Sequence, residues 1–574
     1  MTSGSIRRLC AFLLIIFPIS LFSLSFSDSG APAELAAAIE QAMSDEQALA
    51  QTFMLGWVGA EPSPLIMDWI RMRNIGGVKI FGWNTDDTRR LARTVGTLQE
   101  ASLAGQFNIP LLMATDQEGG WIRHVKGSTS ETPGNMAIGA SGYPRDAYLS
   151  GYYIGKELAI LGINMNFAPT VDLFTNRDSV LIGPRAFGSD PVKTGILGAA
   201  FMKGQLAAGV IPTAKHFPGH GDTDLDSHGI LPRIDISFEQ LWDRELVPYR
   251  MLANEGLPAV MSGHLAFPKT GAASAPASLS SWFLMDVLRE KIGFRGVVVT
   301  DDLMMNGAAT WAGSVSRAAR QALLAGNDII MLSKTPNLYD PVWTFLVSAM
   351  QNDAEFRRRV RDAARRVLEM KLMYLRGENA ASYIPDLHRV ESELPDPDGS
   401  VFFLNLAARS VTIVKNREES GVQQAGGAQQ AGGALTGGSA EAAVNTLPLK
   451  PENAGQVLLA GQFGDFFRTG LAAFPGAASL RYSFGAASEL QRYARNADTI
   501  IFCLSDAEGL RLLRSLEPLK KRVIVLSVLS PVYIESVPWI NAAVAVYSYA
   551  PESFTAGFSA ITGRINAGGK LPYE

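Results

Sequence analysis

Short apolar runs alternate with longer segments of helical spacing over most of the first 335 residues. The apolar runs are rich in Val, Ile, Leu and Met, which is typical of the buried strands of a parallel sheet covered by helices. Eight such strands predict an α/β fold, a closed (β/α)8 barrel of the TIM type. The expected strands are 53–59, 77–81, 110–115, 163–167, 210–215, 258–262, 296–300 and 328–332. The expected helices include 88–104, 147–161, 193–208, 238–254 and 314–325.

A second apolar pattern begins at residue 411 and predicts a separate, smaller domain. Its buried runs also alternate with helical segments, which favours an α/β sandwich domain built on a parallel sheet. A run of Gly, Ala, Gln and Ser at 420–443 predicts a disordered, low-complexity surface insertion. The domains are therefore expected at 28–376 for the barrel, 377–400 for a linker and 401–574 for the sandwich domain.

The amino-terminal residues are typical of an export signal. Two arginines precede an apolar run at 9–24, and a small-x-small sequence follows it. We expect residues 1–27 to be removed as a signal peptide, which would place the protein in the periplasm or outside the cell. No membrane span is expected after cleavage, whereas an uncleaved signal would act as an anchor. Cleavage would leave Cys503 as the single cysteine, so no intramolecular disulfide is expected.

The near balance of acidic and basic residues limits the kinds of molecule that this protein is expected to bind. Lys and Arg total 51, Asp and Glu total 55, and the formal net charge is −4. Basic blocks are absent from the sequence, so no nucleic-acid partner is expected. Polar, uncharged ligands fit this balance better, and the sequence leaves the oligomeric state open.

Polar side chains gather directly after the expected strands, where the active sites of (β/α)8 barrels lie. Most of them follow the fifth strand, within residues 213–232. A solvated turn would also be rich in Asp and Ser, but it would not explain three histidines and a lysine. The polar residues past the strands are Asp116, Gln117, Glu118, Asp172, Arg185, Lys215, His216, His220, Asp222, Asp224, Asp226, His228, His264, Asp301 and Asp302.

A metal site is the second interpretation of this histidine-rich loop. His216 and His220 are four residues apart, as two ligands on one helix turn would be. Pro218 and Gly219 between them break such a helix, so the spacing does not favour a metal. We therefore expect neither a metal nor another cofactor.

Five motifs together resemble those of the bacterial β-N-acetylglucosaminidases of glycoside hydrolase family 3. The resemblance runs in the family's order over most of residues 54–332, and it implies a barrel fold, a retaining mechanism and a terminal N-acetylglucosamine substrate. The motifs are DQEGG at 116–120, NFAPTVD at 166–172, IGPRAFGSDP at 182–191, KHFPGHGDTDLDSH at 215–228 and VVTDDLMM at 298–305.

The resemblance assigns catalytic roles to three residues. Asp301 matches the family's nucleophile, which forms a glycosyl-enzyme intermediate. Asp226 and His228 match an Asp-x-His pair that serves as acid and base in place of a second carboxylate. An imidazole with an ordinary pKa near 6.5 can donate a proton to the leaving oxygen and later accept one from water.

Other motif positions are expected to bind the sugar. Asp116 matches a carboxylate that accepts hydrogen bonds from distal hydroxyls, and Lys215, His216 and Arg185 match donors. The family usually has an arginine eight positions after the DQEGG aspartate, where this chain has His124. Either the loop shifts by one residue to present Arg123, or this contact is changed.

The function expected from these residues is an exported exo-β-N-acetylglucosaminidase acting on peptidoglycan fragments or chitooligosaccharides. A β-glucosidase of the same family is the alternative for specificity. A phosphorylase is a further alternative, because a neutral histidine repels phosphate less than a carboxylate does. A non-catalytic sugar-binding protein of the cell wall is a third alternative. The intact set of Asp301, Asp226 and His228 argues against this last one.

Overall fold

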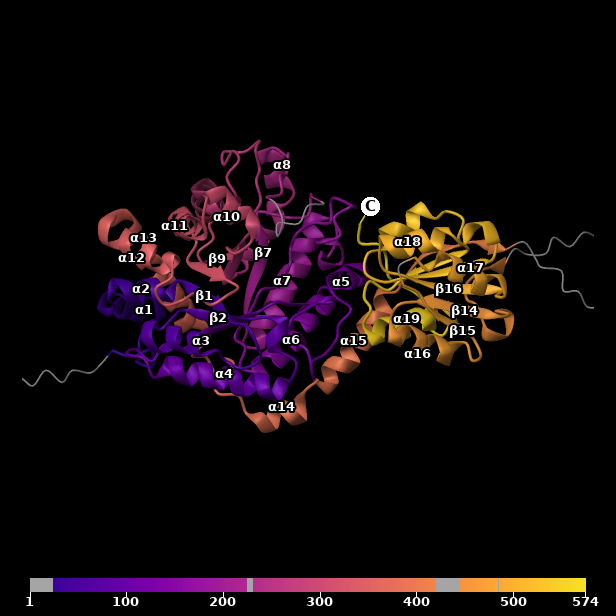
Figure 1. Cartoon of the computed structure of the whole chain (residues 1–574), viewed down its shortest axis with the longest axis horizontal. Helices are drawn as coiled ribbons and strands as arrows, with labels where there is room; N and C mark the ends of the chain where they lie inside the picture. Colours follow the sequence, from indigo (N-terminus) through magenta and orange to yellow (C-terminus); the bar gives the residue numbers. More distant parts are fainter. Residues whose placement is uncertain (1–23, 224–230, 420–443, 484, 574) are drawn as a thin grey trace, which may run out of the picture.

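The computed structural model of the chain describes residues 24–223, 231–419, 444–483 and 485–573. Figure 1 shows a larger body formed by the first part of the chain and a smaller one, in orange and yellow, formed by the last part. Residues 1–23 of the expected signal peptide and the expected insertion at 420–443 lie outside the described residues. Within the described part of the chain, no helix is both long and apolar enough to cross a membrane.

Eight parallel strands of the larger body close into a barrel, in the order β1-β2-β3-β6-β7-β8-β9-β10. This confirms the predicted barrel, and each expected strand region contains one barrel strand. A short hairpin of β4 and β5 follows β3 and lies outside the barrel sheet. The strands are β1 Phe53–Gly56, β2 Gly77–Ile80, β3 Leu112–Thr115, β4 Gln117–Gly119, β5 Ile122–Arg123, β6 Met165–Asn166, β7 Ile211–Phe217, β8 Ala259–Ser262, β9 Val297–Asp302 and β10 Ile329–Leu332.

Strand β6 is shorter than the expected 163–167, because amide side chains take over part of its hydrogen bonding. The Oδ1 atom of Asn164 accepts from the backbone N–H of Met113 at 2.8 Å. The Oδ1 atom of Asn166 accepts from the backbone N–H of Gln117 at 2.9 Å. These amides tie β6 to β3 where regular strand pairing stops.

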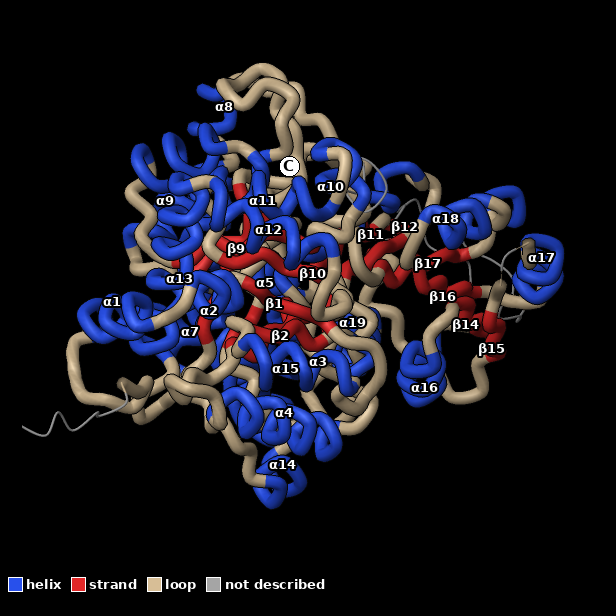
Figure 2. The backbone as a smooth tube through the Cα atoms, turned by 60° about the vertical axis from the view of Figure 1, so that its left-hand side comes forward, coloured by secondary structure: helices blue, strands red, loops and turns tan. Residues whose placement is uncertain are grey.

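Helices surround the barrel, and Figure 2 shows the strands at its centre with the helices around them. Several begin at a side chain that accepts a backbone N–H, such as Asp87 before α4 and Asp190 before α7. The helix expected at 238–254 is two helices, α8 and α9, because the backbone leaves the helical conformation at Arg244. The helices of this body are α1 Pro32–Ala42, α2 Asp45–Gln51, α3 Pro64–Asp68, α4 Thr88–Leu103, α5 Asn135–Ser141, α6 Pro144–Ile160, α7 Pro191–Ala207, α8 Phe238–Asp243, α9 Leu246–Asn254, α10 Asn306–Ala312, α11 Val315–Ala325, α12 Pro341–Asn352 and α13 Ala354–Tyr374, with π-helices at Trp69–Arg73 and Trp282–Lys291.

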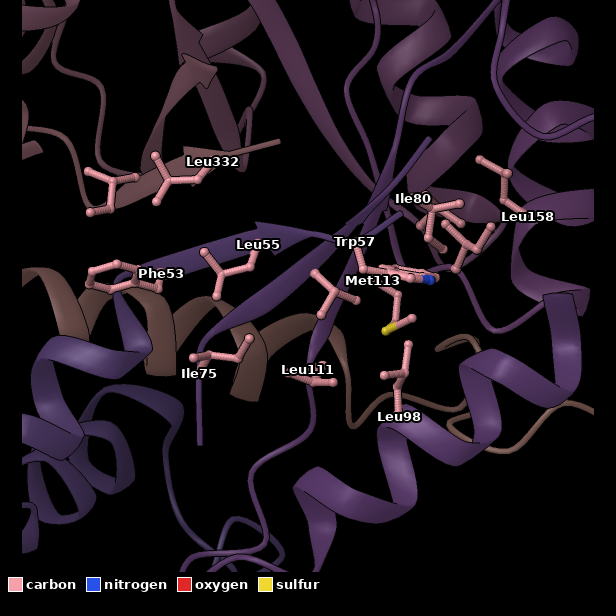
Figure 3. Close-up of a cluster of buried hydrophobic side chains, with 14 of the residues drawn as sticks. Phe53, Leu55, Trp57, Ile75, Ile80, Leu98, Leu111, Met113, Leu158 and Leu332 are labelled. Atoms are coloured by element: carbon pink, nitrogen blue, oxygen red, sulfur yellow. The ribbon is translucent and has the colours of Figure 1, made fainter. Parts of the chain in front are cut away.

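The two faces of the barrel strands carry separate hydrophobic clusters, because successive side chains of a strand point to opposite faces. Phe53 and Leu55 of β1 belong to the outer cluster, whereas Met54 between them belongs to the cluster inside the barrel. Figure 3 shows the outer cluster, with Leu98 of α4 and Leu158 of α6 among its residues. This alternation also shows which residues near the carboxyl ends of the strands point into the barrel mouth.

The smaller body is a six-stranded sheet in the order β11-β18-β17-β16-β14-β15, which confirms the expected α/β sandwich. Its neighbouring strands run parallel, except that β11 is antiparallel to β18. Helices α16 and α19 supply the aromatic residues on one face, and α17 and α18 supply leucines on the other. Its elements are β11 Thr412–Asn416, β14 Val457–Gly461, α16 Gly464–Ala473, β15 Ala478–Arg481, α17 Ala487–Arg495, β16 Thr499–Leu504, α18 Ala507–Arg514, β17 Arg522–Ser527, β18 Ala542–Ala545 and α19 Pro551–Ile561, with a two-stranded pair of β12 Glu418–Glu419 and β13 Val444–Asn445.

Two helices, α14 (Leu387–Glu393) and α15 (Pro397–Ser410), lead from the barrel to the sandwich domain (Figure 1). The expected linker at 377–400 therefore contains α14 and the first turn of α15. The two bodies also touch directly: the Tyr573 ring packs edge-on against Phe174, with ring centroids 5.2 Å apart. This contact places the sandwich domain beside the barrel loops that follow β6.

Candidate active site

Charged side chains at the carboxyl ends of three strands point into the barrel mouth. Ala114 and Val299 belong to the inner cluster, so Asp116 and Asp301, two residues further along, point the same way. Lys215 of β7 joins them through its contact with Asp116. Strands β3 and β9 lie four places apart in either direction around the barrel. Asp116 and Asp301 therefore lie on opposite sides of the mouth.

Lys215 links two carboxylates on one side of the mouth. Its Nζ atom lies 2.5 Å from Asp116 Oδ1 and 2.6 Å from Glu118 Oε1. Arg185 holds Glu118 as well, with Nε and Nη2 donating to its two oxygens at 2.9 and 2.7 Å. Burial raises the pKa of Glu118, but the charges of Arg185 and Lys215 outweigh burial and lower it to about 2. The expected site residues Asp116, Arg185 and Lys215 thus meet in one ionised network. Glu118 adds a second carboxylate to this network.

Asp172, at the rim after β6, orients His216. Its Oδ2 atom accepts from Nδ1 of His216 at 2.7 Å, and its Oδ1 atom accepts the backbone N–H of His220 at 2.7 Å. The Nη2 group of Arg185 lies 3.3 Å from Nε2 of His216. A guanidinium only donates, so this nitrogen accepts. Both ring nitrogens of His216 are thus engaged by neighbouring side chains, and its role as a donor to a sugar hydroxyl stays a prediction.

Asp301 is a partly buried carboxylate at the end of β9. Its Oδ1 atom accepts the backbone N–H of Asp302 at 2.8 Å. Burial raises the pKa of Asp301, but His216, His264 and this N–H outweigh burial, so the pKa lies below its ordinary value of 3.8. The Asp302 carboxylate instead accepts two other backbone N–H groups, each at 3.0 Å. Of the two neighbours, Asp301 is the one that the strand presents to the mouth as an ionised group.

The expected acid/base pair, Asp226 and His228, falls in segment 224–230, outside the described residues. The described chain reaches this segment through Asp222, whose Oδ2 atom lies 2.5 Å from Nη2 of Arg244. How the pair approaches Asp301 therefore stays a prediction.

The hairpin after β3 separates Arg123 from His124, because neighbouring side chains of an extended segment point to opposite sides. Arg123 turns away from Asp116, and its Nη2 group donates to the backbone oxygen of Thr129 at 2.7 Å. His124 turns toward the mouth, with Nδ1 3.6 Å from Oδ2 of Asp116. The structure thus places an imidazole beside Asp116, where the family resemblance leads us to expect an arginine.

Lys79 on β2 is a further charged residue of the mouth, and the sequence analysis did not identify it. Its neighbours Val78 and Ile80 belong to the outer cluster, so Lys79 points inward. Its Nζ atom lies 2.7 Å from Asp116 Oδ2 and 3.2 Å from Nδ1 of His124. A lysine inside an otherwise apolar strand is unusual, and that was the signal available in the sequence.

A cavity of about 460 Å³ lies beside His124, between the barrel and the sandwich domain. The stacked rings of Phe81 and Trp83, with centroids 4.5 Å apart, line it together with Trp121. The sandwich domain contributes the segment Ser548–Ala550 to the same cavity. Asp301 is not among the lining residues, so the cavity adjoins the Asp116 side of the mouth.

The described rim combines an ionised carboxylate, Asp301, with buried cations on the opposite side. A ligand with several hydroxyls can bridge the two sides, because each hydroxyl both donates and accepts. Within the described ranges, no group of three or more His, Cys, Asp or Glu side chains is arranged to hold a metal ion. The chemistry of these residues suits nucleophilic attack on an uncharged, hydroxyl-rich ligand.

A family model described as the glycosyl hydrolase family 3 N terminal domain matches residues 47–370, more than half of the chain. The chain belongs to glycoside hydrolase family 3. The matched region of this family 3 chain contains all eight barrel strands and the rim residues Asp116, Lys215 and Asp301.

Named relatives agree with this membership. Beta-hexosaminidase A of Pseudoalteromonas piscicida is 32% identical over 384 residues, which cover 62% of this chain and 61% of that relative. The family 3 chain therefore spans less than two thirds of that protein's length. A beta-hexosaminidase of Tolumonas auensis is 37% identical over 281 residues, 48% of this chain and 81% of the relative. The solved family 3 beta-N-acetylglucosaminidase from Paenibacillus sp. str. FPU-7 is 26% identical with a TM-score of 0.76, covering 93% of this chain and 99% of that one.

Proposed function

We propose that this chain is an exported, retaining exo-β-N-acetylglucosaminidase that removes terminal β-linked N-acetylglucosamine from peptidoglycan fragments or chitooligosaccharides. The observation that carries the proposal is the ionised Asp301 carboxylate in the barrel mouth, opposite the cation-bound Asp116. The beta-hexosaminidase relatives support the choice of sugar. The signal-like residues 1–27 support export.

In the first step, an oxygen of Asp301 attacks the anomeric carbon of the terminal sugar. The bond from that carbon to the leaving oxygen breaks, and the imidazolium of His228 gives this oxygen its proton. Asp226 would orient the ring and stabilise its charged form. The products of this step are a glycosyl ester on Asp301, a neutral His228 and the free aglycone.

In the second step, a water molecule gives a proton to His228 and attacks the same carbon. The ester bond breaks, which restores the Asp301 carboxylate and releases the sugar with its β configuration. Two inversions at one carbon give net retention. Each proton that His228 donates is thus recovered from water within one turnover.

The opposite side of the mouth would hold the distal hydroxyls. Asp116 accepts hydrogen bonds there, because Lys215 and Lys79 outweigh the effect of burial and keep its pKa well below the usual range. Lys215 has three N–H groups and spends two on Asp116 and Glu118, which leaves one for the ligand. The Nη1 group of Arg185 makes no hydrogen bond within the described residues and is a second available donor.

The test compares a chromogenic β-N-acetylglucosaminide with the matching β-glucoside, each with and without inorganic phosphate, and identifies the sugar released. We expect free N-acetylglucosamine as the product and a kcat/KM about 100-fold or more above that for the glucoside. Faster turnover of the glucoside would make the protein a β-glucosidase. A sugar 1-phosphate as main product would make it a phosphorylase, and binding without turnover would make it a sugar-binding protein.

A further inference from the structure

Lys79 and His124 form a pair beside Asp116, and His124 stands where the family resemblance leads us to expect an arginine. Lys79 is 1% exposed, and its Nζ atom has three partners. They are Asp116 Oδ2 at 2.7 Å, the backbone oxygen of Ile80 at 2.9 Å and Nδ1 of His124 at 3.2 Å. Burial lowers the pKa of Lys79 below its ordinary value of 10.5, and the opposing effect of the Asp116 carboxylate is smaller. The 2.7 Å distance to the Asp116 carboxylate is typical of a charge-assisted hydrogen bond from an ammonium.

An ammonium has three N–H groups and no acceptor. All three groups of Lys79 are used by these partners, so Lys79 has none left for a ligand. It also follows that Nδ1 of His124 accepts from Lys79 and carries no proton. Lys79 therefore acts on the sugar site through His124 and Asp116 rather than by touching the sugar.

His124 is a neutral imidazole with its single proton on Nε2. Burial lowers the pKa of His124, the charges of Lys79 and Lys215 lower it further, and Asp116 and Glu118 raise it, with a result of about 4. Its side chain is 30% exposed and lines the cavity between the two domains. Within the described part of the chain, Nε2 of His124 makes no hydrogen bond. An N–H donor thus faces open space beside Asp116.

The neighbouring arginine does not fill this role. Arg123 also lines this cavity, but it lies on the other side of the hairpin from Asp116, where its Nη2 group donates to Oγ1 of Thr129 at 3.1 Å and its Nη1 group lies 3.3 Å from Glu131. Lys79 supplies the positive charge that balances Asp116, and His124 supplies one directed N–H. Lys79 of β2 and His124, which follows β5, thus divide the tasks that a single arginine would combine.

We propose that His124 is a specificity residue that donates its Nε2 proton to a hydroxyl oxygen of the terminal sugar, and that Lys79 positions it by holding this tautomer. The inference rests on the proposed glycosidase function. One sugar hydroxyl can accept from His124 and donate to Asp116 at the same time. A sugar that lacks this hydroxyl leaves both protein groups unpaired, and such sites discriminate strongly against the missing group.

The first experiment measures kcat/KM for the chromogenic substrate and for its 3-deoxy, 4-deoxy and 6-deoxy analogues, built on whichever glycone the wild type hydrolyses. His124→Ala should lose about 10- to 100-fold on the parent substrate and several-fold less on one deoxy analogue, because that analogue no longer uses the hydrogen bond. His124→Gln keeps an N–H donor and should recover part of the loss. The matched control is Arg123→Ala, for which any loss should be equal on all four substrates. An equal loss by His124→Ala on every substrate overturns the proposal.

The second experiment reads the tautomer directly and needs no turnover. The chain has six histidines, so selective ¹⁵N labelling and the His124→Ala spectrum identify the His124 signals. We expect an unprotonated Nδ1 and a protonated Nε2 from pH 5.5 to 8 in the free enzyme. A proton on Nδ1, or an imidazolium within this range, overturns the proposal.

Lys79→Met should release the tautomer, so that His124 populates both forms and titrates closer to its ordinary pKa. Lys371→Met is the matched control, because Lys371 is fully buried on α13 and its Nζ atom contacts Oε1 of Gln51. An unchanged His124 spectrum in Lys79→Met shows that Lys79 does not position it. If the wild type hydrolyses no glycoside, the proposed function fails, while the spectrum still decides the tautomer.

Discussion

Replacing Glu118 by Gln tests whether the buried ion network supports the sugar side of the mouth. Glu118 is 1% exposed and accepts hydrogen bonds from Arg185 and Lys215. The amide of Gln has one oxygen that accepts and one NH2 group that does not. The Gln side chain would therefore leave one buried N–H group of Arg185 or Lys215 without its acceptor and remove a negative charge that offsets these two cations, which costs about 3–5 kcal/mol.

The pKa of Glu118 gives a second value for the contribution of this network to the free energy of unfolding. Its ordinary value is 4.5, and the network lowers it to about 2. At 1.36 kcal/mol for each unit, this corresponds to about 3 kcal/mol of stability. Because the folded-state pKa is depressed, this stabilisation is fully present well above pH 4.5 and is lost as the pH falls toward 2. More than half of it should be gone by pH 3, by the same linkage.

The assay is urea unfolding of the wild type and Glu118→Gln at pH 7.5 and pH 3, followed by tryptophan fluorescence. Eight of the nine tryptophans lie in the barrel, so the signal reports mainly its unfolding. We expect the variant to be less stable by about 3 kcal/mol at pH 7.5 and by less than half of that at pH 3. Its kcat/KM should fall about tenfold or more, because Arg185 and Lys215 lose their shared anchor.

Glu100→Gln on α4 is the control, because Glu100 is exposed and should change stability by less than about 0.5 kcal/mol. A loss below about 1 kcal/mol for Glu118→Gln at pH 7.5 would refute the reasoning. A loss that stays the same at pH 3 would also refute it, since the linkage requires it to shrink.

Three further predictions concern the acid, the nucleophile and a buried carboxyl near the mouth. Asp301→Ala should reduce kcat by about 10⁴-fold or more; a 2-fluoro sugar should label Asp301 in the wild type, and mass spectrometry that finds the label elsewhere contradicts the assignment. His228→Ala should slow substrates with poor leaving groups by about 10²-fold or more and activated aryl glycosides far less, because only the former need the proton; equal losses rule His228 out as the acid. Burial raises the pKa of Glu245 from 4.5 to about 7, against the opposing charge of Arg244, so the wild type should lose stability as the pH rises through this range. Glu245→Gln should match the wild type at pH 4 and exceed it by up to about 3 kcal/mol at pH 8 in urea unfolding, and a difference that does not vary with pH contradicts this account.

The barrel and the main rim residues could be predicted from the sequence, because each rests on a local pattern. A strand buried on both faces leaves an apolar run, and eight such runs between helical segments left few other folds. Asp116, Lys215 and Asp301 were found because they stand just past, or at the end of, such runs. The side chains of Asn164 and Asn166 take over backbone hydrogen bonds beside β6. The apolar run at 163–167 therefore predicted a longer strand than β6 is.

The remaining site contacts were decided by the tertiary structure, through which strands and loops lie side by side. The sequence places Lys79 only within strand β2. Its contact with Asp116 depends on the pairing of β2 with β3, which brings Lys79 beside Ala114. The choice between Arg123 and His124 depended on which side of the β4–β5 hairpin faces the mouth, and both residues fit the sequence pattern equally well. Local periodicity tells which residues share a face of one strand, but which strands lie side by side, and in which register, is determined by packing of the whole barrel.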